Sequence, residues 1–202
     1  MRQALRHPAT WWALLVLGLL PMAWLGGQIW QDQLGANPAE ALIRATGDWT
    51  LRSLCVVLAV TPLRQLLAWP ELVRFRRMLG LLTFFYVCLH LLCYTWFDMG
   101  FEWGDIVQDI PKRPFILVGF SAFLILLALA ATSFNRAIRW LGARRWQALH
   151  RGIYVVAVLA ILHFWWMRAG KQNFAEVLVY AAILIGLLGW RLARRMRSPS
   201  SA

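Results

Sequence analysis

The chain has 202 residues, of which 60% are hydrophobic and 13 are tryptophan, and its mean hydropathy is +0.57. These values exclude a soluble globular domain and a disordered chain, and they predict a protein embedded in a lipid bilayer. The net charge is +12, but the arginines cluster beside apolar runs, so they indicate membrane topology rather than nucleic-acid binding. Cys55, Cys88 and Cys93 all lie inside apolar runs, which indicates neither a disulfide framework nor paired CxxC motifs for zinc.

Six apolar stretches approach the length of a membrane helix, because about 20 helical residues cross a hydrocarbon core of roughly 30 Å. They lie at residues 11–30, 48–67, 78–97, 114–133, 152–166 and 174–191. The fifth is short unless its helix begins earlier, around Trp146. We therefore expect an all-α fold, a polytopic bundle of six transmembrane helices over residues 11–191. A cytoplasmic N-terminal tail at 1–10 precedes it, and a basic, disordered cytoplasmic tail at 192–202 follows it.

Basic and acidic residues alternate between the connections. One set of connections carries most of the arginines: Arg2, Arg6, Arg64, Arg74, Arg76, Arg77, Arg136, Arg139, Arg144, Arg145, Arg151, Arg191, Arg194, Arg195 and Arg197. The opposite set carries most of the acids: Asp32, Glu40, Asp48, Asp98, Glu102, Asp105, Asp109 and Glu176. Because Lys and Arg near membrane ends stay in the cytoplasm, the first set and both termini are predicted to be cytoplasmic.

Two histidines stand at similar depth in the predicted third and fifth helices. Intramembrane ionisable residues are costly and suggest function. His90 and His163 lie in stretches that both run outward from the cytoplasm, so the rise of 1.5 Å per residue places both in the outer half of the bilayer. Six-coordinate haem needs one nitrogen ligand on each side of the porphyrin, in an apolar slot between helices. The pair is therefore a candidate ligand set for haem iron.

His150 opens the fifth stretch and differs from His163 in both depth and helix face. The two cannot bind one iron. His150 would ligate a second haem near the cytoplasmic side, hold a propionate or cap the interface.

Other functions remain open at this point. A polar residue in a membrane helix can simply hydrogen-bond a neighbouring helix, and titratable residues at membrane depth also mark ion paths. A small histidine-relay transporter or proton channel, and a non-redox anchor for a periplasmic enzyme, are the alternatives. The absence of an intramembrane carboxylate in the sequence argues against the relay.

Four segments carry a resemblance to a known family: TGDWTLRSLCVVLAVTPLR, RRMLGLLTFFYVCLHLLCY, DIPKRPFILVGFSAFLILLALAATS and RRWQALHRGIYVVAVLAILHF. They cover most of residues 46–166. With them the chain resembles the MsrQ (YedZ-like) family, the haem-binding membrane subunits of the bacterial periplasmic protein-methionine-sulfoxide reductase system. More distantly, it is similar to the membrane domain of ferric reductases and NADPH oxidases, the ferric reductase-like transmembrane superfamily.

The resemblance implies haem b on His90 and His163 and a place in the bacterial inner membrane. The larger oxidase-type domains have two histidines on each of two helices, whereas here the third stretch has only His90. The place where its second histidine would be expected, near Arg76, carries arginines instead. A conventional second bis-histidine haem is therefore in doubt. No nucleotide-binding domain follows the sixth stretch, so electrons are expected from quinol or from a separate cytoplasmic flavin reductase.

The resemblance thus implies an electron-transfer subunit rather than a catalytic one. Its haem passes electrons to a periplasmic, molybdenum-dependent methionine-sulfoxide reductase that repairs oxidised proteins. A second carrier is needed for the inner half of the membrane: flavin mononucleotide (FMN), a quinone, or haem at His150.

The arginines near the cytoplasmic ends offer anion sites, since guanidinium forks suit phosphates and carboxylates. A flavin phosphate or haem propionates could be held within the cluster Arg74, Arg76, Arg77, Arg144, Arg145 and Arg151. The commoner role of such a cluster is to bind anionic lipid and set orientation.

Overall fold

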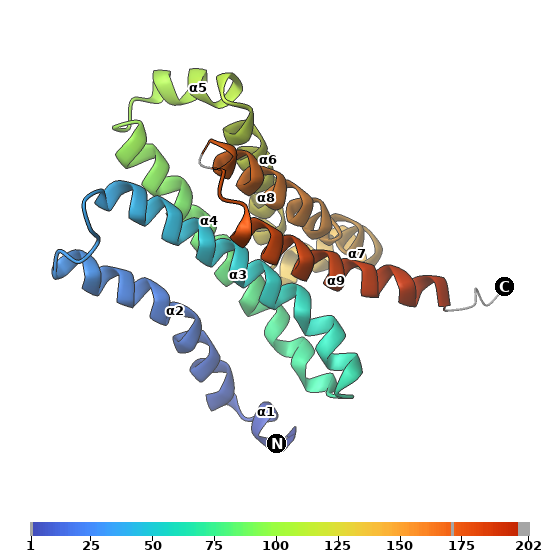
Figure 1. The fold of residues 1–202 in the computed structure, drawn as a ribbon. Helices are drawn as coiled ribbons and strands as arrows, with labels where there is room; N and C mark the ends of the chain where they lie inside the picture. Colours follow the sequence, from blue (N-terminus) through green and yellow to red (C-terminus); the bar gives the residue numbers. More distant parts are fainter. Residues whose placement is uncertain (1, 171, 198–202) are drawn as a thin grey trace.

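The structure, a computed structural model, describes residues 2–170 and 172–197, and within these ranges it consists of helices and short turns (Figure 1). In chain order they are α1 (Arg2–Arg6), α2 (Pro8–Trp30), α3 (Pro38–Leu66), the 3₁₀ turn η1 (Pro70–Phe75), α4 (Arg76–Cys93), the π-helical turn η2 (Tyr94–Asp98), α5 (Trp103–Lys112), α6 (Pro114–Ala131), α7 (Asn135–His150), α8 (Gly152–Ala169) and α9 (Ala175–Arg197). The predicted all-α fold class is confirmed.

Five helical segments in the described part of the chain are long and apolar enough to cross a membrane: Pro8–Trp30, Pro70–Asp98, Pro114–Ala131, Asn135–Ala169 and Ala175–Arg197. They correspond, within two residues at the ends of the fourth and sixth, to the first, third, fourth, fifth and sixth expected spans. The second expected span lies in α3, which has 29 residues but carries Glu40, Arg44, Asp48, Arg52 and Arg64. These charges keep α3 outside the apolar set, so the count of six is not confirmed.

The two expected tails are partly helical. Residues 1–10 include α1 and the start of α2. The tail expected to be disordered from 192 onward is helical up to Arg197, because α9 continues to that residue. The rest of that expected tail, 198–202, lies outside the described residues. The basic connection before the fifth span is also helical: α7 includes Trp146 and bends at Gly142, whose φ is +73°.

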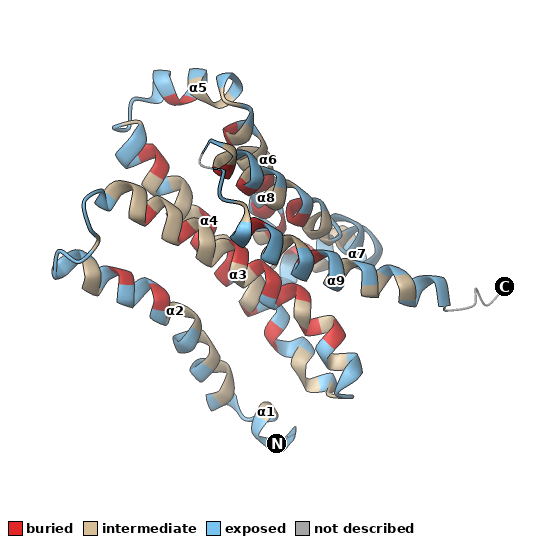
Figure 2. Ribbon diagram, viewed as in Figure 1, coloured by how far each residue is buried: buried red, intermediate tan, exposed pale blue. Residues whose placement is uncertain are grey.

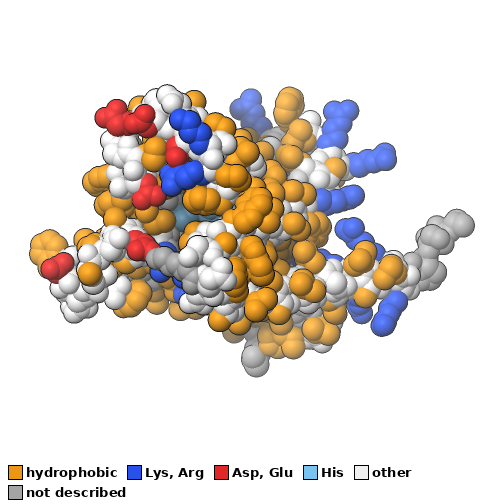
Figure 3. All heavy atoms as spheres, turned by 45° about the horizontal axis from the view of Figure 1, so that its top comes forward, with side chains coloured by type: hydrophobic (Ala, Val, Ile, Leu, Met, Phe, Trp, Pro, Cys, Tyr) orange, Lys and Arg blue, Asp and Glu red, His pale blue; other side chains and the backbone are white. Residues whose placement is uncertain are grey.

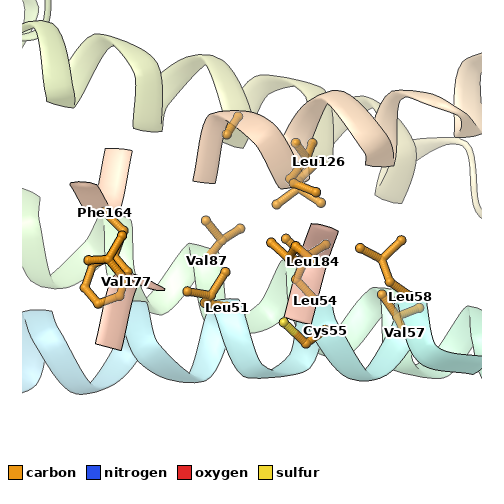
Figure 4. Close-up of a cluster of buried hydrophobic side chains, with 13 residues drawn as sticks. Leu51, Leu54, Cys55, Val57, Leu58, Val87, Leu126, Phe164, Val177 and Leu184 are labelled. Atoms are coloured by element: carbon orange, nitrogen blue, oxygen red, sulfur yellow. The ribbon is translucent and has the colours of Figure 1, made fainter. Parts of the chain in front are cut away.

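Two helix pairs form the centre of the bundle. α3 packs along α4, α6 packs along α8, and α9 packs against both α3 and α8. The largest group of buried side chains lies where these helices meet (Figures 2 and 4), and among its members are Leu51, Leu54, Leu58, Val87, Leu126, Val156, Phe164, Val177 and Leu184. α5 lies across one end of the bundle (Figure 1). The two pairs thus define a shared interior with α9 at its side.

Charge separates the two ends of the bundle, and most acidic and most basic side chains lie on opposite sides in Figure 3. We call one end the Arg-rich end, which carries the arginines of α1, η1, α7 and the last turns of α9. The other is the acidic end, formed by α5, the turn before it and the start of α9. Glu71, the exceptional acid among the arginines, pairs with Arg6 at 2.8 Å.

α2 is the most loosely attached long helix. Its buried residues are Pro21 and Leu25, and it stands apart from α3 in Figure 1. The Tyr86 hydroxyl, on α4, donates to the Gly18 carbonyl of α2 at 2.7 Å. Tyr86 itself is 2% exposed, so this hydrogen bond ties α2 to the core.

Tyr86→Phe is expected to lower the free energy of unfolding by about 1 kcal/mol, because it removes one interhelical hydrogen bond and leaves the ring in place. Thermal unfolding of the purified protein in detergent would measure the loss. An unchanged midpoint would show that α2 is not held by this hydroxyl.

Candidate functional site

The structure brings His90 and His163 together. His90 lies on α4 and His163 on α8, and their ring centroids are 6.1 Å apart with ring planes at 80°. Both residues are half-buried, and both line one cavity. Two histidines 73 residues apart in sequence thus present their imidazoles to the same cavity.

Each imidazole is held by a backbone carbonyl of the partner helix in its pair. The Nδ1 of His90 lies 2.9 Å from the Ile43 carbonyl oxygen on α3, and the Nδ1 of His163 lies 2.6 Å from the Phe115 carbonyl oxygen on α6. Because a carbonyl only accepts, each Nδ1 must carry the proton, which leaves each Nε2 with a free lone pair. This is the arrangement of a metal-binding histidine whose second nitrogen fixes the ring.

A glycine one helical turn after each acceptor makes room for the ring. A Cβ at Gly47 would lie 3.0 Å from Cε1 of His90, and a Cβ at Gly119 would lie 2.8 Å from Nδ1 of His163. Both glycines therefore permit a close approach that any side chain would obstruct. We call each combination of a carbonyl and the glycine four residues later a cradle: Ile43 with Gly47, and Phe115 with Gly119.

The cavity between the two helix pairs has a volume of about 610 Å³, within the range of cofactor sites. Its deeper wall is apolar and includes Leu51, Leu54, Val87, Phe123, Leu126 and Val156. Polar residues lie where it meets the acidic end, among them Asn37, Glu40, Arg44, Asp48, Asp98 and Arg113. The cavity is thus an apolar slot with a charged mouth.

The donor set suits the iron of a haem better than a bare metal ion. Among the described residues, no group of three or more His, Cys, Asp or Glu side chains could hold a metal ion. Two neutral imidazoles supply only two ligands, whereas a porphyrin brings four nitrogens of its own and needs an apolar slot. His90, His163 and the cavity walls fit that requirement.

The structure places His150 apart from this pair. It ends α7, its ring stacks on Trp146 at 3.9 Å, and its Nδ1 lies 3.1 Å from the Trp146 carbonyl oxygen. Its Nε2 is buried and has no hydrogen-bond partner in the described part of the chain. His150 does not line the cavity of His90 and His163.

The arginines singled out from the sequence are not gathered into one site. Arg77 donates to Asn135 at 2.8 Å, and Arg144, Arg145 and Arg151 are exposed. Arg76 lines a second cavity, and its neighbours there include four arginines of α9: Arg191, Arg194, Arg195 and Arg197. In the sequence these four arginines indicate only topology, because nothing in their spacing shows that the end of α9 meets the start of α4.

One acid of α5, Asp109, is paired with two residues that line the histidine cavity. The Tyr94 hydroxyl donates to Asp109 at 2.7 Å, and Arg113 donates to the same carboxylate through Nε at 2.8 Å. The hydrogen bond from Arg113 holds the pKa of Asp109 below its ordinary value. Asp109 is therefore an ionised part of the local structure, whereas Asp98, Glu102 and Asp105 have exposed or half-exposed side chains at the same end.

Comparison with known proteins agrees with the geometry. A family described as "Ferric reductase like transmembrane component" matches residues 46–161, a range that contains His90, His150 and both cradle glycines and ends two residues before His163. No solved structure matches the chain.

Several curated relatives are named "Protein-methionine-sulfoxide reductase heme-binding subunit MsrQ". The chain is 63% identical to that of Polaromonas naphthalenivorans, with 98% of this chain and 93% of the relative covered. It is 50% identical to that of Herminiimonas arsenicoxydans, with 94% and 88% covered, and 52% identical to that of Bordetella pertussis, with 94% and 91% covered.

Gly119→Ala is expected to lower the free energy of unfolding by about 1–3 kcal/mol, because the new methyl group and the His163 ring cannot both keep their places. Gly186→Ala is the matched control in α9, since a Cβ there meets no atom within 4 Å. The control should be neutral or stabilising by up to about 1 kcal/mol, as alanine favours helix. Thermal unfolding of both variants in detergent is the measurement, and equal behaviour would contradict the cradle.

Proposed function

The chain belongs to the ferric reductase-like family and, within it, to the MsrQ haem-binding subunits of protein-methionine-sulfoxide reductase, and from this premise we propose that it conducts electrons across a membrane through haem b. In this proposal His90 and His163 would hold the haem iron. The observation that carries it is the repeated cradle, which fixes both Nδ1 protons and turns two Nε2 lone pairs toward ligation.

Haem bound here would supply one-electron iron chemistry. The residues of the chain would orient it and exclude water. The cradles hold the imidazole planes, and the apolar wall lowers the local dielectric, which tunes the reduction potential. Arg44 and Arg113 at the mouth are positioned to offset propionate charge, although each is already paired with a carboxylate, Glu40 and Asp109 respectively.

The proposed topology has six membrane crossings: the five apolar segments and α3, which is the second crossing in chain order. α3 packs along α4 in the centre of the bundle, and its Arg52 donates to Tyr180 of α9 at 2.9 Å, inside the protein rather than toward lipid. The positive-inside rule then assigns the Arg-rich end and both termini to the cytoplasm of a bacterium, with the chain in the inner membrane. The histidine cavity would open toward the periplasm.

The proposed electron acceptor is a periplasmic, molybdenum-dependent methionine-sulfoxide reductase, and the donor is quinol or a cytoplasmic flavin reductase. Electron tunnelling weakens steeply with distance, and one haem near the acidic end leaves the Arg-rich half without a carrier. FMN, a quinone or a second haem at His150 would fill that gap. The buried, unpartnered Nε2 of His150 favours a ligand there.

An absorption spectrum of the purified, dithionite-reduced protein tests the proposal. His90→Ala and His163→Ala are each expected to abolish the six-coordinate, low-spin b-type signature, because each removes one axial ligand. His150→Ala is the matched control and should keep the haem of the acidic end. Iron per chain in that variant reports whether a second haem exists.

A colourless wild-type protein would instead favour a histidine-relay transporter or a non-redox anchor. Normal spectra in both His90→Ala and His163→Ala would show that the ligands are wrongly assigned.

Partner docking at the acidic end predicts a salt-dependent rate. Replacing Asp98, Glu102 and Asp105 by Asn, Gln and Asn should slow electron delivery to the periplasmic partner about tenfold at low salt, because long-range attraction is lost. At about 0.5 M salt the rates of variant and wild type should converge, since charges are screened. Stopped-flow haem oxidation measures both, and equal rates at low salt would refute docking at this surface.

A further inference from the structure

The second cavity lies at the Arg-rich end, where four helices meet. It has a volume of about 610 Å³ and is lined by Thr61 and Gln65 of α3, Arg76 of α4, Tyr154 of α8 and the last turns of α9. None of its lining residues is acidic, and five are arginines: Arg76, Arg191, Arg194, Arg195 and Arg197. The cavity therefore concentrates positive charge, and no acidic side chain lines it among the residues that the structure describes.

Arg191 is the most constrained of these side chains. Its Nη2 donates to the Leu58 carbonyl of α3, and its guanidinium lies 5.4 Å from the Tyr154 ring. Its Nε and Nη1 are buried and have no hydrogen-bond partner among the described residues. Unsatisfied donors on a buried cation are costly, so two donor nitrogens remain available for an acceptor that the described residues do not provide.

Two other partly buried arginines of the bundle have carboxylate partners. Arg168 pairs with Glu176 at 2.6 Å, and Arg113 pairs with Asp109. Arg191 forms no salt bridge in the described part of the chain, and the cations Arg76 and Arg195 line the same cavity. An external anion would satisfy the free donors and relieve the repulsion between these cations.

We propose that this cavity binds the phosphate group of an anionic phospholipid. A planar guanidinium fork matches phosphate oxygens, and basic pockets between membrane helices bind lipid headgroups. α9 also carries exposed apolar side chains, with Leu192 59% exposed and Ile185 71% exposed, and acyl chains would contact these. A lipid bound here links α9 to α3 and α8.

The source of the phosphate is what the experiment must decide. The full-length protein is extracted, delipidated and returned to nanodiscs of phosphatidylcholine with or without phosphatidylglycerol. Native mass spectrometry then counts retained lipids, and thermal unfolding is followed in parallel. We expect phosphatidylglycerol to be retained at least tenfold more tightly than phosphatidylcholine and to raise the unfolding midpoint.

Arg191→Met is expected to weaken phosphatidylglycerol retention at least tenfold. Arg144→Met is the matched control, because it removes an equal charge from an exposed position outside the cavity. If Arg191→Met does not fold, Arg195→Gln, which keeps Arg191, should give a smaller loss in the same direction.

Equal loss in Arg191→Met and Arg144→Met would overturn the proposal, because it would show general charge attraction alone. A second arm adds inorganic phosphate or FMN to the delipidated protein in neutral detergent. If either one stabilises the wild type while no anionic lipid is retained, the bound phosphate is soluble and the lipid is the wrong source. Because the readouts are lipid retention and unfolding, the result does not depend on the proposed electron transfer.

Discussion

The hydrogen bond from each histidine Nδ1 to a helical carbonyl is the interaction on which the site depends. A neutral imidazole in an apolar interior has one donor and one acceptor, and without a fixed partner it can exchange which nitrogen carries the proton. The Ile43 and Phe115 carbonyls remove that freedom for His90 and His163. Since each bond crosses a helix pair, the packing of α3 on α4 and of α6 on α8 sets the chemistry of the cavity.

Much of this could be predicted from sequence because depth follows from counting residues along a helix. His90 and His163 were expected at similar depth, and their ring centroids lie 6.1 Å apart. The glycines were not identified, because a Gly in a membrane helix has many roles and only the pairing of α3 with α4 and of α6 with α8 shows what Gly47 and Gly119 face. The Ile43-to-Gly47 and Phe115-to-Gly119 spacing is the signal that was available.

The arginines show the opposite limit. A shared place near the predicted cytoplasmic ends grouped Arg76 with Arg74, Arg77, Arg144, Arg145 and Arg151, whereas the fold groups Arg76 with the end of α9. Charge was informative for the two ends of the bundle because basic residues gather in the connections at one end and acidic residues in those at the other. It was uninformative for the site because contacts between distant helices are not encoded in local composition. α3 illustrates the same point, since its charges obscure a helix that lies centrally in the bundle.

Each helix pair provides one histidine and one cradle glycine. The α3–α4 pair provides His90 and Gly47, and the α6–α8 pair provides His163 and Gly119. Neither pair is a complete site. A cofactor bound by both imidazoles would cross-link two separately packed helix pairs. Binding of that cofactor would therefore be coupled to the packing of one pair against the other. Cofactor binding and the last step of folding would then be a single event. Without the cofactor, the α3–α4 pair and the α6–α8 pair would move more freely relative to each other.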